Sequence, residues 1–401
     1  MEMKRYFAFG MAVLTACCLL STACSGISKG ENACSINNGA LEETVEKFDA
    51  YDLDLYMKPL WEGEIVYNET LTFVGETDVA PLLYPAAEII SVRSYDLQTE
   101  YVNGKDYGFH KKNNVIILGE GTKMPYWTEE EYYPSEKIQG KAFDCTVAEK
   151  PYIVFGEGST MCERQVAVTY RHTAETYITK PLSQKEVFSR TIGKLQANEE
   201  TKILFFGDSI TVGANSSGYV SYSPYAPTWP RMVFDSMVKK YGVTKAEYIN
   251  TAVGGWSTQN GLDDLQARVL DYQPDAVFIG FGMNDVNLSP AEHIAKIKQM
   301  VDLIRAALPN VEICLISTML PNAEAQGFYR EQVNFQEKYA ELASAYRAEG
   351  KQVCYANVTK MHQELLKVKR YRDMTGNNVN HPNDFLARVY AQTVFQTVCG
   401  D

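Results

Sequence analysis

A serine in a tight turn is the residue of this sequence best placed to do chemistry. The apolar run 202–206 predicts a buried strand, and Gly207 allows the backbone to turn sharply after it. Ser209 would then emerge at the carboxyl end of a strand, the edge at which open α/β sheets bind ligands. A serine hydroxyl is a poor nucleophile unless a histidine takes its proton and hydrogen-bond donors hold the oxyanion that forms.

Residues of these kinds follow Ser209 along the chain. Two glycines, 254 and 255, come after another apolar stretch, and the backbone N–H of Gly255 is open to a ligand because no Cβ stands in its way. Asn284 follows the apolar run 276–281, and its side-chain amide is a second candidate donor. His381 is one of only five histidines and precedes a helix-like stretch, which makes it the candidate base.

Four short blocks hold these residues and resemble, in the same order, the conserved blocks of the SGNH/GDSL hydrolase superfamily. The blocks are Gly207-Asp208-Ser209, the Gly255 turn, Gly282-Met283-Asn284-Asp285 and His381, and they cover about residues 200 to 401. The resemblance implies an ester hydrolase with Ser209 as nucleophile and His381 as general base. It also implies an oxyanion hole made of the Ser209 and Gly255 N–H groups and the Asn284 side chain. Asp208 is expected to shape the turn, and Asp285 is expected to support the site by capping the next helix.

The position three residues before the histidine departs from the family pattern. The family has an aspartate there, whereas this chain has Asn378. An amide oxygen can orient an imidazole ring, but it cannot stabilise the charged ring as a carboxylate does. The ring of His381 is therefore oriented by Asn378, by Asp373 or Asp384 from another direction, or by a backbone carbonyl.

Each of these residues also has a purely structural interpretation. Ser209 can be a helix N-cap, a role that serine often fills. The two glycines can form a plain turn, Asn284 can cap a helix, and His381 can be a surface histidine held by Pro382. The occurrence of all four blocks in order favours the catalytic interpretation.

The N-terminal sequence is typical of a secretory signal. Residues 1–24 combine a charged start with a short apolar stretch, and residues 25–40 are polar like a flexible tether. Cys24 or Cys17 would accept the lipid of a bacterial lipoprotein, and a cleaved signal without lipid is the alternative. We therefore expect an exported protein, either a cell-envelope lipoprotein or a periplasmic or extracellular one, with membrane anchoring only through such a lipid.

The rest of the chain predicts two domains of different classes. Residues 41–185 contain short β-rich runs separated by turn residues, which is typical of an antiparallel β-sandwich, jelly-roll-like. Residues 186–401 alternate strand-like and helix-like runs, such as the helix expected over 290–307. This βαβ pattern, together with the resemblance, predicts a flavodoxin-like three-layer α/β hydrolase domain with a parallel sheet.

Composition limits the partners. The net charge of −12 offers no basic stripe to neutralise phosphates, so nucleic acid is not expected as a partner. The nine cysteines form no CxxC or Cys/His cluster, so no metal or other cofactor is expected. Cys145 and Cys162 could pair in an exported protein, but their spacing does not decide it.

The function that these features favour is hydrolysis of short acyl esters, acetyl above all, on carbohydrate through an acyl-enzyme at Ser209. The two-domain order resembles that of carbohydrate esterase family two. A lipase-like or lysophospholipase-like acyl hydrolase is one alternative. A glycan-binding surface lipoprotein with catalysis impaired by Asn378 is the other.

Overall fold

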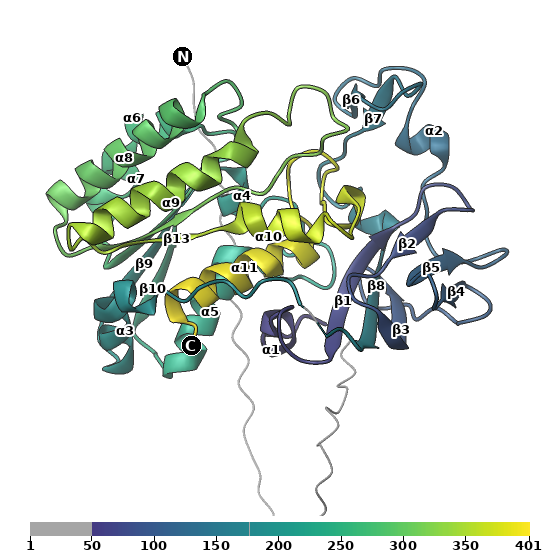
Figure 1. The fold of residues 1–401 in the computed structure, drawn as a ribbon, viewed down its shortest axis with the longest axis horizontal. Coiled ribbons are helices and arrows are strands. Elements are labelled where there is room, and N and C mark those ends of the chain that lie inside the picture. Colours follow the sequence, from purple (N-terminus) through teal and green to yellow (C-terminus); the bar gives the residue numbers. More distant parts are fainter. Residues whose placement is uncertain (1–49, 176) are drawn as a thin grey trace, which may run out of the picture. The chain divides into compact units, whose positions relative to one another are not determined.

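The second half of the chain builds a parallel sheet. The computed structural model describes residues 50–175 and 177–401. Five strands pair in parallel in the order β10-β9-β11-β12-β13. Figure 1 shows β9, β10 and β13 of this sheet among the helices. They are β9 Thr201–Gly207, β10 Ala246–Asn250, β11 Ala276–Gly280, β12 Glu312–Ile316 and β13 Val353–Ala356. Counted along the sheet this is the order 2-1-3-4-5 of flavodoxin-like proteins, which confirms the predicted α/β class.

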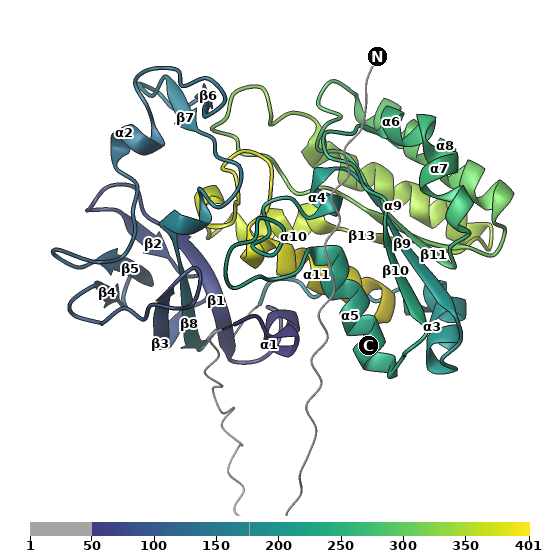
Figure 2. The ribbon, with the colours of Figure 1, turned by 180° about the vertical axis from the view of Figure 1, so that it is seen from behind.

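Alternate residues of the strands face two different helical layers. Ile203 and Phe205 of β9 belong to one hydrophobic cluster, whereas Leu204 and Phe206 belong to another. The first cluster includes helices α5 Trp229–Tyr241 and α11 Asp384–Cys399, and the second includes α8 Pro290–Ala307 and α9 Gln332–Ala348. Figure 2 shows these two pairs of helices on opposite sides of the strands. Smaller helical elements are α3 Ser189–Gln196, α4 Ser209–Val212, α6 Thr258–Asp263, α7 Leu265–Arg268 and α10 Val358–Leu365.

Antiparallel strands dominate the region before residue 185, as predicted. One sheet has the order β1-β8-β3, a second has the order β2-β5-β4, and β6 and β7 form a separate pair. The bounds are β1 Ile65–Thr72, β2 Val79–Pro81, β3 Ala86–Ser94, β4 Tyr107–His110, β5 Val115–Leu118, β6 Ala142–Asp144, β7 Tyr152–Val154 and β8 Gln165–His172, with short helices α1 Leu53–Met57 and α2 Glu129–Tyr132. Leu71 of the first sheet shares a hydrophobic cluster with Ile116 of the second.

The β region and the α/β region share a core. The cluster that contains Phe73 and Val166 of the β region also contains Phe205 and Phe385 of the α/β region. The described residues accordingly pack as one compact unit. The boundaries at residues 40 and 185 stay predictions.

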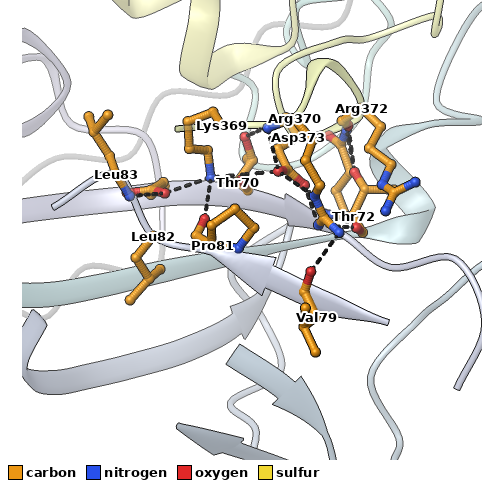
Figure 3. Close-up of polar contacts among 12 residues, drawn as sticks. Thr70, Thr72, Val79, Pro81, Leu82, Leu83, Lys369, Arg370, Arg372 and Asp373 are labelled. Atoms are coloured by element: carbon orange, nitrogen blue, oxygen red, sulfur yellow. Dashed lines mark hydrogen bonds and ion pairs between the residues drawn. The ribbon is translucent and has the colours of Figure 1, made fainter. Parts of the chain in front are cut away.

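Buried charges also link the two regions (Figure 3). The Lys369 ammonium donates to Glu69 Oε1 at 2.6 Å and to the carbonyl of Thr70 at 3.1 Å, and the side chains of Lys369 and Glu69 are fully buried. Arg370 donates to the Thr72 carbonyl at 2.6 Å and to Asp373 Oδ1 at 2.8 Å. The segment that leads to His381 is thus bound to strand β1 by charge-assisted hydrogen bonds.

Two further findings concern the expectations about membranes and thiols. No helix in the described part of the chain is both long enough and apolar enough to span a bilayer. Cys145 and Cys162 are free thiols. The predicted signal, tether and lipid-acceptor cysteines at 17 and 24 lie outside the described residues.

Candidate active site

Ser209 lies at the carboxyl end of the central strand β9. Asp208 is the N-cap of the short helix α4, and its Oδ1 accepts from the Ile210 N–H at 3.0 Å. Gly207 is required here, since a Cβ would stand 2.2 Å from the carbonyl oxygen of Gly280 on the neighbouring strand β11. The chain leaves β9 toward β10 on one side, with β11 on the other, so Ser209 is at the switch point where α/β sheets bind ligands.

The structure brings His381 to this serine. His381 Nε2 and Ser209 Oγ are 2.9 Å apart, and each of the two residues is 8% exposed. The backbone around the histidine is held by its own segment, because the His381 N–H donates to Asn377 Oδ1 and its carbonyl accepts from Thr375 Oγ1, both at 3.0 Å. The predicted nucleophile and base therefore meet in a geometry that allows proton transfer.

Asn215 fixes which ring nitrogen carries the proton. Its Oδ1 is 2.6 Å from His381 Nδ1, while its Nδ2 donates to the carbonyls of Gly158 and Gly376, each at 3.2 Å. Because both carbonyls can only accept, the amide nitrogen must face them and the amide oxygen must face the ring. Nδ1 therefore carries hydrogen, and the lone pair of Nε2 points at the Ser209 hydroxyl.

Asn377 does not compete for this position. Its Nδ2 is 2.9 Å from His381 Nδ1, but it donates to Asn380 Oδ1 at 2.9 Å and to Glu157 Oε1 at 3.1 Å. An amide NH₂ has two hydrogens, and both are used.

The candidate acids and Asn378 lie elsewhere. Asn378 Oδ1 accepts from the Tyr132 hydroxyl at 2.8 Å, and its Nδ2 donates to the Val154 carbonyl at 3.0 Å. Asp373 accepts from Arg370, and Asp384 Oδ1 accepts from the backbone N–H of Ser217. The interpretation that one of these three residues orients His381 is therefore replaced: buried partners hold them, and Asn215 occupies the place beside the ring.

The candidate oxyanion donors line the same cavity as the Ser209 side chain. Gly255 has φ of 77°, a conformation that favours glycine, and a Cβ on Gly254 would lie 3.9 Å from the Cβ of Ser209. The N–H groups of Ser209 and Gly255 form no hydrogen bond with another described residue. Asn284 Nδ2 donates to the Trp256 carbonyl at 2.9 Å, which orients the amide and leaves its second hydrogen for a ligand.

Asp208 and Asp285 are both buried carboxylic acids close to the turn that carries Ser209. Burial raises the pKa of Asp208 to about 7 despite the hydrogen bond from Ile210, and the carboxylate of Asp285 adds to the rise. Asp285 Oδ1 accepts from the N–H of Thr258 at 3.1 Å and from its hydroxyl at 2.9 Å. The expectation that Asp285 caps the next helix is wrong, since Ser289 caps α8 and Asp285 instead fixes the start of α6.

A cavity of about 390 Å³ joins these groups. Ser209, Gly255, Asn284 and His381 all line it. One wall consists of Phe143, Phe155 and Phe328, with ring centroids of neighbouring pairs 4.9–5.0 Å apart, and the remaining lining residues are Glu157, Val212, Ala214, Tyr219, Gly254, Val379 and Asn380. No cluster of three or more metal-ligating side chains occurs among the residues that the structure describes.

Sequence reasoning missed two residues at the ring, Asn215 and Glu157. Asn215 has a positive φ of 65°, a conformation in which asparagine is enriched, but nothing in the sequence shows that the loop after α4 folds back onto the histidine. Glu157 belongs to the β region, and its Oε1 lies 3.6 Å from His381 Nδ1. Only the packing of the two regions reveals it.

Comparison with known proteins agrees with the geometry. Residues 205–388 match the model of the GDSL-like Lipase/Acylhydrolase family. An arylesterase of Vibrio mimicus is 31% identical over 118 residues, which are 29% of this chain and 54% of that protein. The chain thus spans about half the length of this curated relative.

Two solved structures are similar at low identity. A two-domain esterase (CEX) active on acetylated mannans has a TM-score of 0.42 with 20% identity, over 54% of this chain and 54% of that one. Axe2, an acetylxylan esterase from Geobacillus stearothermophilus, has a TM-score of 0.41 with 16% identity, over 50% of this chain and 94% of that one.

Proposed function

Residues 205–388 belong to the GDSL-like Lipase/Acylhydrolase family, and from this premise we propose that the chain is a serine esterase acting on short acyl esters of carbohydrates. The observation that carries the proposal is the hydrogen bond between Ser209 Oγ and His381 Nε2 inside a cavity that also contains Gly255 and Asn284. A nucleophile, a base and unpaired donors in one cavity are the requirements of acyl transfer.

The reaction follows from the positions of the protons. The Ser209 hydroxyl gives its proton to Nε2 as Oγ attacks the acyl carbon, and the ring becomes an imidazolium whose Nδ1–H stays bound to Asn215. The N–H groups of Ser209 and Gly255 and the Asn284 amide hold the oxyanion. Nε2 then protonates the leaving alcohol, and water releases the acid from the acyl-enzyme by the same steps in reverse order.

The cavity supports the choice of substrate. About 390 Å³ is near the lower end of ligand sites, and this space must hold both the acyl group and part of the alcohol, which favours a short acyl group such as acetyl. The wall of Phe143, Phe155 and Phe328 suits the apolar face of a sugar ring, while Tyr219 and Asn380 offer hydrogen bonds to its hydroxyls. The proposal includes export to the cell envelope, which rests on the sequence of residues 1–24.

A substrate panel tests this function. Acetate release is measured from acetylated xylan, mannan and monosaccharides, beside nitrophenyl esters from acetyl to dodecanoyl. We expect release from acetylated sugars and a fall in kcat/KM as the acyl chain lengthens, because a long chain does not fit the cavity. A rise with chain length would instead favour the lipase-like function, and glycan binding without cleavage of any ester would favour the binding lipoprotein.

The orientation of His381 by Asn215 gives a second prediction. Asn215→Ala is expected to lower kcat by about 10², the order of a positioned general base, because the ring loses the acceptor that fixes its tautomer. Asn215→Asp should retain kcat within about tenfold, since a carboxylate oxygen also accepts from Nδ1–H. Both variants lose the two bonds to Gly158 and Gly376, so each is the structural control of the other. Equal losses in the two variants would contradict the orienting role.

A further inference from the structure

Glu157 is an ionisable residue of the β region that lies beside the catalytic histidine. It follows strand β7, it lines the cavity, and its Oε1 is 3.6 Å from His381 Nδ1. The carboxylate is held in place because Oε1 also accepts from Asn377 Nδ2 at 3.1 Å. Its side chain is 52% exposed, whereas that of His381 is 10% exposed.

In the proposed reaction the imidazolium of His381 has a hydrogen-bond acceptor in Asn215 but no negative charge from it. Asn215 accepts the Nδ1–H bond, but it is neutral and cannot offset the positive charge that the ring gains when Ser209 gives up its proton. A carboxylate within 4 Å favours the charged ring without needing a direct hydrogen bond to it.

We propose that Glu157, supplied by the β region, is the acidic positioning residue of His381 and stabilises the imidazolium formed during ester cleavage; this inference rests on the proposed function. Glu157 takes no proton in this scheme. The Oγ–H bond of Ser209 breaks, the Nε2–H bond forms, and the carboxylate stays ionised throughout.

The surroundings of the ring support this assignment. In the described part of the chain, no other carboxylate lies within ion-pair distance of His381, since Asp373 pairs with Arg370 and Lys369 and Asp384 binds Ser217. Although burial acts to raise the pKa of Glu157, its hydrogen bonding and attraction to His381 outweigh burial and lower that pKa, so the carboxylate is charged at neutral pH. The β region therefore contributes a charge to the site as well as two of the three phenylalanines of its wall, Phe143 and Phe155.

Glu157→Gln tests the inference, because the amide retains the acceptor for Asn377 but removes the charge. We expect kcat/KM for nitrophenyl acetate to fall about threefold to tenfold at pH 7. The acidic midpoint of the pH profile of kcat/KM should move down by about 0.5–1 unit, which is the effect of one neighbouring charge that water partly screens. Both effects should shrink in 1 M salt, because the carboxylate is half exposed. Glu157→Asp should have a kcat/KM and an acidic midpoint between those of the wild type and those of Glu157→Gln.

Glu163→Gln is the matched control, since it removes the same charge from the same segment, where the carboxylate accepts from Ser159 Oγ. Its pH profile should match that of the wild type. NMR titration of the His381 ring gives a readout that needs no turnover, and its midpoint should fall in Glu157→Gln and stay in Glu163→Gln. An active wild type with unchanged profile and unchanged titration in Glu157→Gln would overturn the inference. An inactive wild type whose titration still shifts would refute the esterase proposal and retain the pairing.

Discussion

Ser209→Ala is expected to lower kcat for acetyl esters by at least about 10⁴, the loss found when a serine nucleophile is removed and only binding and oxyanion donors remain. The physical reason is that no other hydroxyl lies at hydrogen-bond distance from His381 Nε2 among the described residues. The fold should survive, because Ser209 is the first residue of α4 and the cap of that helix is Asp208. Turnover of nitrophenyl acetate and the urea midpoint are measured on the same preparation.

Ser236→Ala is the control for this substitution. Ser236 lies on α5, away from the cavity, and its buried hydroxyl has no hydrogen-bond partner within the described residues, so its removal costs little. The control should keep the turnover of the wild type. Wild-type turnover in Ser209→Ala as well would show that another residue is the nucleophile.

Strand-end residues were predictable because of how parallel sheets are built. Ser209, Gly255 and Asn284 follow the neighbouring strands β9, β10 and β11, and the carboxyl ends of parallel strands meet at one edge. The pattern of apolar residues predicts the strands, and their parallel direction places their carboxyl ends at one edge of the sheet. His381 was predicted because its block follows the other three in the order of the family, and the structure places it on the same cavity.

The partners of the ring were not predictable from the same signals. Asn215 reaches His381 across 166 residues of sequence, and Glu157 comes from another region of the fold. Neither has a spacing rule that relates it to His381, because loops set their positions. Asn378 illustrates the converse: its place in the sequence suggested the ring, but the Tyr132 hydroxyl and the Val154 carbonyl hold its side chain.

The buried ion pair between the β region and the α/β region could not be predicted from the sequence either. Glu69 lies within a strand and Lys369 just after a helix, and an isolated lysine or glutamate is usually exposed. Only the tertiary structure shows that they satisfy each other at 2.6 Å with no exposure. Their energetic weight leads to the second large expected effect.

Lys369→Met is expected to lower the free energy of unfolding by about 3–5 kcal/mol, because it leaves the carboxylate of Glu69 buried without its cation. The thioether cannot replace the bonds that Lys369 donates to the carbonyls of Thr70 and Pro81. Urea unfolding at pH 7 measures the loss. Lys338→Met is the matched control: Lys338 pairs with Glu341 at 2.8 Å, but the two side chains are 41% and 64% exposed, so water screens the pair and its loss should leave the urea midpoint close to that of the wild type.

Removing both charges separates the cost of an unpaired carboxylate from the value of the pair. Lys369→Met combined with Glu69→Gln should recover part of the stability that Lys369→Met loses, since a neutral amide is far less costly to bury than a lone carboxylate. No recovery would mean that the lysine acts mainly through its carbonyl partners. The pair also binds strand β1 to the segment that carries His381, so a folded Lys369→Met protein should turn over esters more slowly. Unchanged turnover in that protein would limit the network to stability and leave Asn215 and the loop of residues 374–383 as sufficient to position the base.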